Sequence, residues 1–119
     1  MKKFESYEYF LKDLEENTGY QVYDQRTDAH GVKTPYIVCQ RVSNNDFHAD
    51  NGILLKKDQI SVNLHTFQKN YSLNGEKVKA EKKLETYLSE CGSLFDRDED
   101  WLDDINLYRI SYGLEICYD

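Results

Sequence analysis

The sequence predicts an α+β domain in which two main helices pack on one face of an antiparallel sheet. Two segments place apolar residues at helical spacing, and two later segments alternate between apolar and polar residues. The connectors between the expected strands are too short for the crossovers that join parallel strands. At 119 residues the chain has the size of a single domain, so we treat residues 1–119 as one folding unit.

The first helix is expected over residues 4–17. Gly19 follows it, at the place where a helix C-terminus favours glycine. Residues 20–23 form a short candidate strand, and the polar stretch 24–34 after it shows no apolar periodicity. The apolar residues of the helix recur at helical spacing among charged ones: Phe4, Tyr7, Leu11 and Leu14.

Segments 36–42 and 59–65 are expected to pair as antiparallel strands. The first begins after Pro35 and is rich in β-branched and aromatic residues. The second alternates between apolar and polar residues, as a half-buried strand does. Between them, residues 43–52 hold three asparagines, two aspartates and a glycine, which is typical of a turn-rich connector.

A second helix and a final strand complete the expected fold. Ser72 or Asn74 caps this helix and Gly92 ends it. Residues 94–95 form a short candidate strand, and residues 108–118 alternate at period two, which predicts a long terminal strand. The helix carries one apolar stripe: Val78, Ala80, Leu84, Tyr87, Leu88 and Cys91.

The net charge of −7 argues against a general binder of nucleic acid or of anionic membranes. No apolar run approaches the roughly 20 residues that cross a bilayer, and charged residues follow Met1 where a signal peptide is apolar. We therefore expect a soluble protein that contacts no membrane. The cysteines, Cys39, Cys91 and Cys117, are expected to be buried thiols in a reducing compartment.

Residues 96–104 hold six acidic side chains around one arginine and the only tryptophan. The alternate acids at the start of this segment resemble a calcium-binding loop. The glycine and the distal glutamate of such a loop are absent, because Trp101 and Leu107 stand at those positions. We expect a mobile, solvated, metal-free loop in which only the indole of Trp101 packs against the sheet.

The other candidate sites are interpreted as ordinary surface or core residues. His48, Asp50 and His65 are metal-ligand types, and the two histidines would meet if they faced each other across a hairpin. Cys39 lies among apolar residues, where a thiol is inert. The lysines of the second helix alternate with glutamates at ion-pair spacing, which favours a solvated face. Since no catalytic or nucleotide-binding motif occurs, we expect no enzymatic activity, metal or cofactor.

Five segments, in this order, carry a resemblance to a known family. They are residues 34–41 (Thr-Pro-Tyr-Ile-Val-Cys-Gln-Arg), 47–51 (Phe-His-Ala-Asp-Asn), 59–66 (Gln-Ile-Ser-Val-Asn-Leu-His-Thr), the Glu- and Lys-rich helix from Gly75, and 108–116. The ordered set resembles the small tail-completion or tail-terminator (head-tail joining) structural proteins of tailed bacteriophages and prophages of Gram-positive bacteria. Two departures, Cys39 for a common aromatic residue and His65 for a frequent tyrosine, affect packing more than function.

The resemblance implies a subunit that forms a closed ring, often a hexamer, at the end of the tail tube and meets the head connector. Its partners would be further copies of itself, the tail-tube protein and the head-connector protein, with DNA only as passing cargo. Such a protein belongs to the virion and is present in the host cytoplasm during assembly. No catalysis is implied.

Two groups of residues are the candidate contact sites. The length of the 43–57 loop and the ten tyrosines favour subunit contacts. The candidate partner contacts are Phe47, His48, Asp50 and Asn51. Because acidic groups repel phosphate, they suit a channel through which DNA slides. The candidates for facing this lumen are Asp96, Asp98, Glu99 and Asp100. The alternative function is an acidic inhibitor or adaptor that occupies a basic cleft of another protein.

Overall fold

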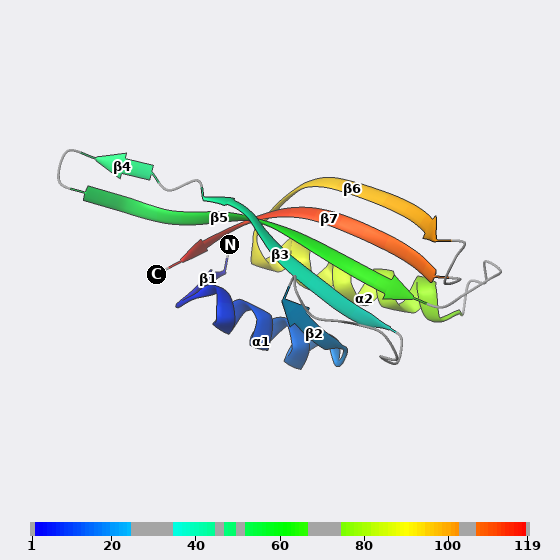
Figure 1. Ribbon diagram of the computed structural model, residues 1–119. Coiled ribbons are helices and arrows are strands. Elements are labelled where there is room, and N and C mark those ends of the chain that lie inside the picture. Colours follow the sequence, from blue (N-terminus) through cyan, green and yellow to red (C-terminus); the bar gives the residue numbers. More distant parts are fainter. Residues whose placement is uncertain are drawn as a thin grey trace.

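The computed structural model describes residues 2–24, 35–44, 47–49, 52–66, 75–102 and 107–118. In this part of the chain two helices and seven strands form an α+β fold, with both helices on the same face of a curved sheet (Figure 1). In chain order these are β1 (Lys3–Phe4), α1 (Tyr7–Thr18), β2 (Gln21–Asp24), β3 (Tyr36–Asn44), β4 (Phe47–Ala49), β5 (Gly52–Thr66), α2 (Glu76–Cys91), β6 (Ser93–Leu102) and β7 (Leu107–Tyr118).

The sheet is mixed, so the prediction of a purely antiparallel sheet is wrong at two places. The strand order is β1-β7-β5-β3-β2, with β6 also paired to β7 and β4 to β5. The pairs β3–β5, β5–β7 and β6–β7 are antiparallel, whereas β2 runs parallel to β3 and β1 parallel to β7. The ten residues 25–34 between β2 and β3 reach up to roughly 33 Å when extended, which is longer than the four-residue β2, so the chain can return to the same end of the sheet.

The predicted pairing of 36–42 with 59–65 is confirmed. Its register runs from Tyr36 opposite His65 to Arg41 opposite Ile60, and it then shifts by one residue before Ser43. On its other side β5 pairs with β7 over its inner eleven residues. β5 is therefore the central strand, and it is much longer than the seven residues whose alternation predicted it.

The helices differ from the predictions at their ends. α1 begins at Tyr7 because the Ser6 hydroxyl accepts a hydrogen bond from the Tyr9 amide at 3.3 Å, while Phe4 lies in β1. Gly19 ends α1 with a left-handed φ of 76°, as predicted. α2 starts after Gly75, and the predicted caps Ser72 and Asn74 lie outside the described residues. Neither described helix is long and apolar enough to cross a lipid bilayer.

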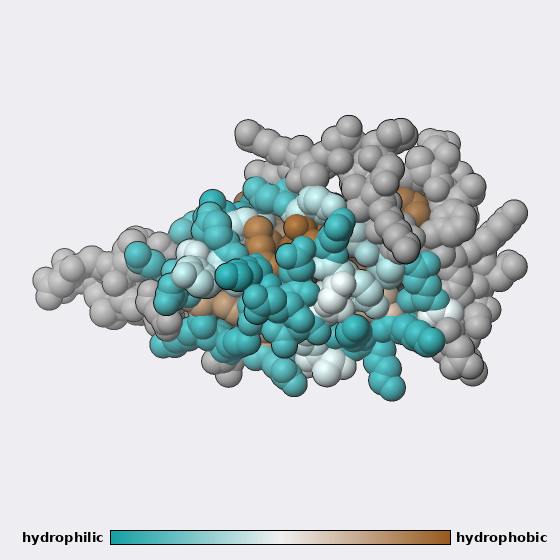
Figure 2. Space-filling model, turned by 90° about the horizontal axis from the view of Figure 1, so that it is seen from below, coloured by the Kyte–Doolittle hydropathy of each residue, from teal (hydrophilic) through white to brown (hydrophobic). Residues whose placement is uncertain are grey.

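One apolar core lies between the helices and the sheet. Cys39, Cys91 and Cys117 are buried free thiols, which confirms their predicted burial. Burial also raises the pKa of the Cys39 and Cys91 thiols, so neither forms a reactive thiolate readily. The helix side of the molecule is mostly hydrophilic on its outside (Figure 2). The largest fully buried side chains include Phe10, Leu14, Ile37, Ile60, Leu64, Leu84, Leu88, Ile110, Leu114 and Ile116.

Candidate functional site

A two-stranded arm projects from one end of the sheet (Figure 1). β3 and β5 stay paired as far as Asn44 opposite Asp58, and β5 then continues outward to Gly52 with β4 beside it. We call β4 together with residues 52–55 of β5 the arm. The predicted turn-rich connector 43–52 is therefore largely strand, and the molecule measures 54 × 27 × 23 Å.

The arm carries part of the predicted partner contact. The backbones of Phe47 and His48 lie in β4, while Asp50 and Asn51 fall outside the described residues. The arm sequence is apolar for a projecting segment, with Phe47 in β4 and Ile-Leu-Leu at 53–55 in β5. Because a two-stranded hairpin is marginally stable alone in water, a projecting arm of this composition favours contact with another surface.

The predicted acidic loop is wrong: residues 93–102 form the strand β6. It pairs with β7 from Ser93 opposite Glu115 to Leu102 opposite Leu107, with one register shift. This strand was not predicted because charged side chains occupy both of its faces, so its sequence shows no alternation of apolar and polar residues. The indole of Trp101 packs on the sheet as predicted, with its ring centroid 4.6 Å from that of Tyr108.

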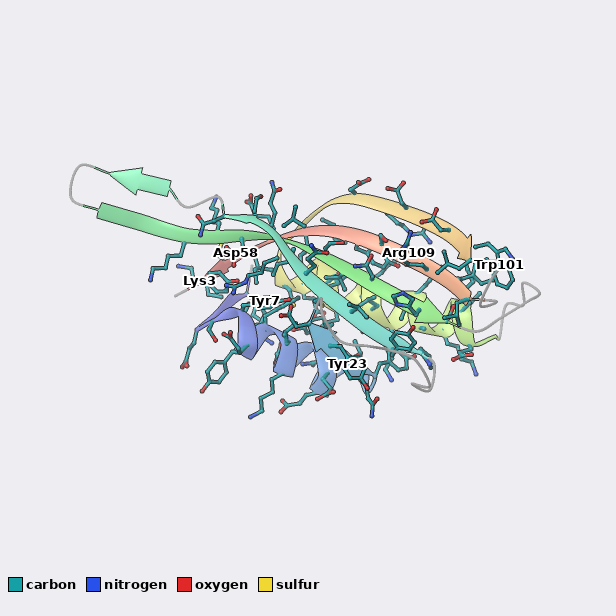
Figure 3. The ribbon with its side chains drawn as sticks, viewed as in Figure 1. Lys3, Tyr7, Tyr23, Asp58, Trp101 and Arg109 are labelled. Carbon is teal, nitrogen blue, oxygen red and sulfur yellow. The ribbon has the colours of Figure 1, made fainter. Side chains whose placement is uncertain are left out.

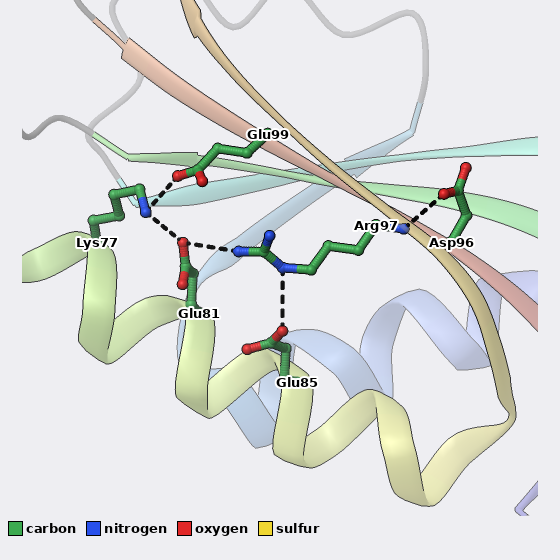
Figure 4. Close-up of polar contacts among 6 residues, drawn as sticks. All are labelled: Lys77, Glu81, Glu85, Asp96, Arg97 and Glu99. Atoms are coloured by element: carbon green, nitrogen blue, oxygen red, sulfur yellow. Dashed lines mark hydrogen bonds and ion pairs between the residues drawn. The ribbon is translucent and has the colours of Figure 1, made fainter.

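Alternation divides the charges of β6 between two faces of the sheet. Arg97 and Glu99 reach α2, where Arg97 bridges Glu81 and Glu85 at 3.3 Å each (Figure 4). We call these residues, together with Lys77, the latch: Lys77, Glu81, Glu85, Arg97 and Glu99. It replaces the apolar contacts that normally hold a strand to a helix.

Lys77 is the buried centre of the latch. It is 5% exposed, its ammonium lies 2.6 Å from the Glu81 carboxylate, and it also pairs with Glu99. Burial alone would lower the pKa of Lys77, but the hydrogen bonds to Glu81 and Glu99 raise it above its ordinary value. Sequence reasoning placed Lys77 on a solvated helix face, because the partner Glu99 is distant in the chain.

No described helix covers the opposite face of the sheet (Figure 1), and polar residues such as Asn63, Ser111 and Arg109 lie on that face. Residues 59–61 of β5 and 111–113 of β7 line a shallow hollow of about 260 Å³, together with Asp96 and Asp98 of β6 and Val42 of β3. Asp100, the next residue on this face, pairs with Arg109 at 2.9 Å. We call this surface the open face. It brings together three of the four predicted lumen residues, while Glu99 points to α2.

A hydrogen-bonded ladder crosses the middle of the open face. The Ser111 hydroxyl donates to Asn63 Oδ1 at 2.6 Å, and Asn63 Nδ2 donates to the Val38 carbonyl at 3.2 Å. The Ser111 and Asn63 side chains come from β7 and β5, and the accepting carbonyl belongs to the backbone of β3. The polar groups at the centre of the face are therefore fixed by one another, which gives a rigid, hydrophilic surface.

His65 stands opposite Arg109 in the register of β5 and β7, and Figure 3 shows Arg109 at the end of the sheet away from the arm. Its ring stacks on Tyr36 at 4.7 Å, and burial together with the charge of Arg109 lowers its pKa. His48 pairs with Ile53, which is twelve positions from His65 along β5 or roughly 40 Å, so the two histidines do not face each other across a hairpin. Within the described residues no cluster of three or more ligand-type side chains could hold a metal ion.

The fold is shared with a chain of known structure. That chain is described as "Virion of native gene transfer agent (GTA) particle"; it matches with a TM-score of 0.59 and 13% sequence identity, over 87% of this chain and 82% of its own length. At this identity the likeness establishes a common fold. No protein-family model and no curated protein matches the sequence.

Proposed function

We propose that this chain is a structural subunit of a phage or prophage virion, of the tail-terminator or head-tail joining kind. The observation that carries the proposal is the shared fold with a chain from a gene transfer agent virion, over most of both chains. The sequence resemblance to tail-completion proteins points the same way. In this proposal copies of the chain form a ring at the end of the tail tube and join it to the head connector, without any catalytic step.

The arm supplies the contact that such a ring needs. A ring is built from heterologous contacts, in which one patch of a subunit meets a different patch of its neighbour. An arm that leaves the body at one end satisfies this requirement, because it extends away from its own body and contacts a different patch on the neighbouring subunit. Phe47, His48, Asp50 and Asn51 then lie at the subunit contact.

The open face suits the lumen of the ring. Asp96, Asp98 and Asp100 lie on it, and no described helix stands in front of them. Carboxylates repel the phosphates of passing DNA, whereas basic groups would hold the DNA through counterion release. Glu99 is not proposed to face the lumen, because its carboxylate pairs with Lys77 on the helix side of the sheet.

The test is the mass of the assembled protein. Light scattering over a concentration series, with the full chain alone and with purified tail tubes, is expected to show a closed oligomer of one size in at least one of the two conditions. Electron microscopy of the mixture then shows whether the oligomer lies at tube ends. A chain that stays monomeric with and without tubes contradicts the proposal.

The alternative of an acidic inhibitor has less support. An inhibitor of a basic cleft needs a continuous field of free carboxylates. Here Glu81, Glu85 and Glu99 are held in the latch, and Asp100 pairs with Arg109. The acids of the open face are too few to form such a field.

A further inference from the structure

Five polar side chains from five elements form a chain of contacts that runs from the base of the arm into the body. We call them the root network: Tyr7 of α1, Asp24 of β2, Arg41 of β3, Asp58 of β5 and Tyr118 of β7. Figure 3 shows Asp58 at the base of the arm and Tyr7 below it. The contacts of this network link the arm to elements throughout the body.

Asp58 is the buried centre of the root network. It is 5% exposed, the Tyr118 hydroxyl donates to its Oδ2 at 2.5 Å, and Nη1 of Arg41 lies 3.8 Å from the same oxygen. Burial and the bond to Asp58 raise the pKa of Tyr118, so this hydroxyl remains a donor. A buried carboxylate is costly without such partners.

The carboxylate is not needed to fill space. Every second residue of β5 from position 58 onward is buried, and the next three after Asp58 are apolar: Ile60, Val62 and Leu64. An apolar side chain at 58 would continue that set. A carboxylate makes directional hydrogen bonds, which hold the strands in one relative position. Apolar contacts alone would allow the strands to slide past one another.

The network holds β5, which continues into the arm, and β3, which pairs with β5 up to the base of the arm. Asp58 stands opposite Asn44 in the last pair of β3 and β5, and Arg41 stands at the register shift of β3. The guanidinium of Arg41 lies 4.7 Å from the centre of the Tyr7 ring, and the Tyr7 hydroxyl donates to Asp24 at 2.8 Å. The two strands are thus tied to each other and to α1, β2 and β7.

We propose that Asp58, Arg41 and Tyr118 are positioning residues that fix the direction of the arm relative to the body. The inference rests on the proposed function in one respect: a ring closes only if each subunit meets its neighbour at the same angle, so a fixed arm is what assembly requires. The direction of the arm in a single subunit can be measured independently of assembly.

The experiment measures distances between two spin labels by pulsed electron resonance. One label is attached at Ala49→Cys on β4 and the other at the exposed Lys82→Cys on α2, while the buried native cysteines are checked for labelling in the chain without added cysteines. The parent is expected to give one narrow distance distribution. Asp58→Asn and Tyr118→Phe are each expected to broaden it and to shift its maximum.

Asp13 provides a matched control with the same chemistry elsewhere. It accepts a hydrogen bond from the Tyr87 hydroxyl at 2.5 Å and one from Lys2 at 2.7 Å, and it joins α1 to α2 rather than to the arm. Asp13→Asn is expected to lower the melting temperature and to leave the distance distribution narrow. If Asp58→Asn fails to fold, Tyr118→Phe carries the test.

Two results overturn the inference: an unchanged distribution in the folded Asp58 and Tyr118 variants, or an equal broadening in Asp13→Asn. Light scattering on the same variants separates this failure from a failure of the proposed function. A parent that never assembles, with a distribution that broadens in Asp58→Asn, supports the positioning role and contradicts the ring. A parent that assembles, with a distribution that stays narrow in Asp58→Asn, supports the ring and contradicts the positioning role.

Discussion

Lys77 and Asp58 are charged residues at positions where the pattern of their element buries side chains. Lys77 lies on the buried stripe of α2, and Asp58 in the buried set of β5. Each is met by polar groups from another element, Glu99 of β6 for Lys77 and Tyr118 of β7 for Asp58. Because a buried charge without a partner is strongly unfavourable, each residue favours only the packing that brings its partner into place.

His65 is expected to make stability depend on pH in the mildly acidic range. Burial and the charge of Arg109 lower its pKa from the ordinary 6.5. As the pH falls, the unfolded chain therefore binds the proton first, so stability is fully present above about 6.5 and is lost as the pH falls from there through the folded-state pKa. His65→Gln should flatten the unfolding free energy between about pH 7 and pH 5, as measured by urea titration.

Gln40→Asn, an exposed position on β3 of the same sheet, serves as the control for His65. Because it removes no titratable group, it is expected to keep the parent's slope of stability against pH. A His65→Gln variant with the parent's slope would contradict the assignment.

At the scale of elements, β6 is held by its partner strand and by the latch rather than by an apolar face. Glu99→Gln is expected to lower stability by about 1 kcal/mol, because it weakens the pairing of the buried Lys77 while solvent screens part of the effect. Asp98→Asn, one residue away on the open face, should change stability by no more than about 0.5 kcal/mol in either direction. Thermal unfolding at low and at high salt measures both.

The salt dependence shows whether Glu99→Gln loses stability because the ion pairs of the latch are weakened or because β6 tolerates no change of charge. If the latch acts through charge, the difference between Glu99→Gln and the parent shrinks as salt rises. Equal losses of stability in Asp98→Asn and Glu99→Gln would show that β6 tolerates no change of charge at either position. The latch would then contribute no specific stabilisation.

The joint between α2 and β6 depends on the absence of a side chain at Gly92. A Cβ built there would lie 2.2 Å from the backbone carbonyl oxygen of Glu115, which cannot move aside without shifting β7. Gly92→Ala is therefore expected to cost about 3 kcal/mol, at the upper end for overpacking. At Gly19 a Cβ would lie 3.8 Å from Lys83 Nζ, an ordinary contact distance, but the φ is 76°, so Gly19→Ala should cost about 1 kcal/mol. Chemical denaturation gives both values, and a smaller loss at Gly92 than at Gly19 contradicts this account.

Elements with one apolar face were predictable, and elements held by distant partners were not. β5 and β7 show period-two alternation in the sequence itself, and α1 and α2 show the helical period. β6 has charges on both faces, so only its pairing with β7 and the latch reveal it. The arm was likewise hidden, since short polar residues around 43–52 are typical of turns.

At the scale of the whole molecule, the chain divides into a body with its own core and an arm outside it. The described core residues all belong to the body, and β4 pairs only with β5 in the described part of the chain. The α+β class was predictable from periodicity. The parallel placement of β1 and β2 was not, because the choice of neighbouring strand is made by packing across the whole sheet.

Removing the arm is expected to leave a folded body that cannot assemble. Replacing residues 47–55 by Asn-Gly joins the two strands at the base through a two-residue type I′ turn, and it retains the pairing of Lys56 and Lys57 with β7. Because the core and the root network stay intact, the melting temperature should change by no more than a few degrees. In light scattering the variant should remain monomeric at concentrations where the parent assembles.

Asp98→Asn is the companion variant for assembly, since it changes the open face and leaves the arm intact. It is expected to assemble as the parent does, because carboxylates that face a lumen act on passing DNA and not on subunit contacts. In the proposed function the arm closes the ring and the open face repels passing DNA, so these two variants test the two proposed roles separately. An armless variant that still forms the parent's oligomer would move the contact to the body, where β6 and β2, the edges that no other described strand pairs with, would be the next surfaces to alter.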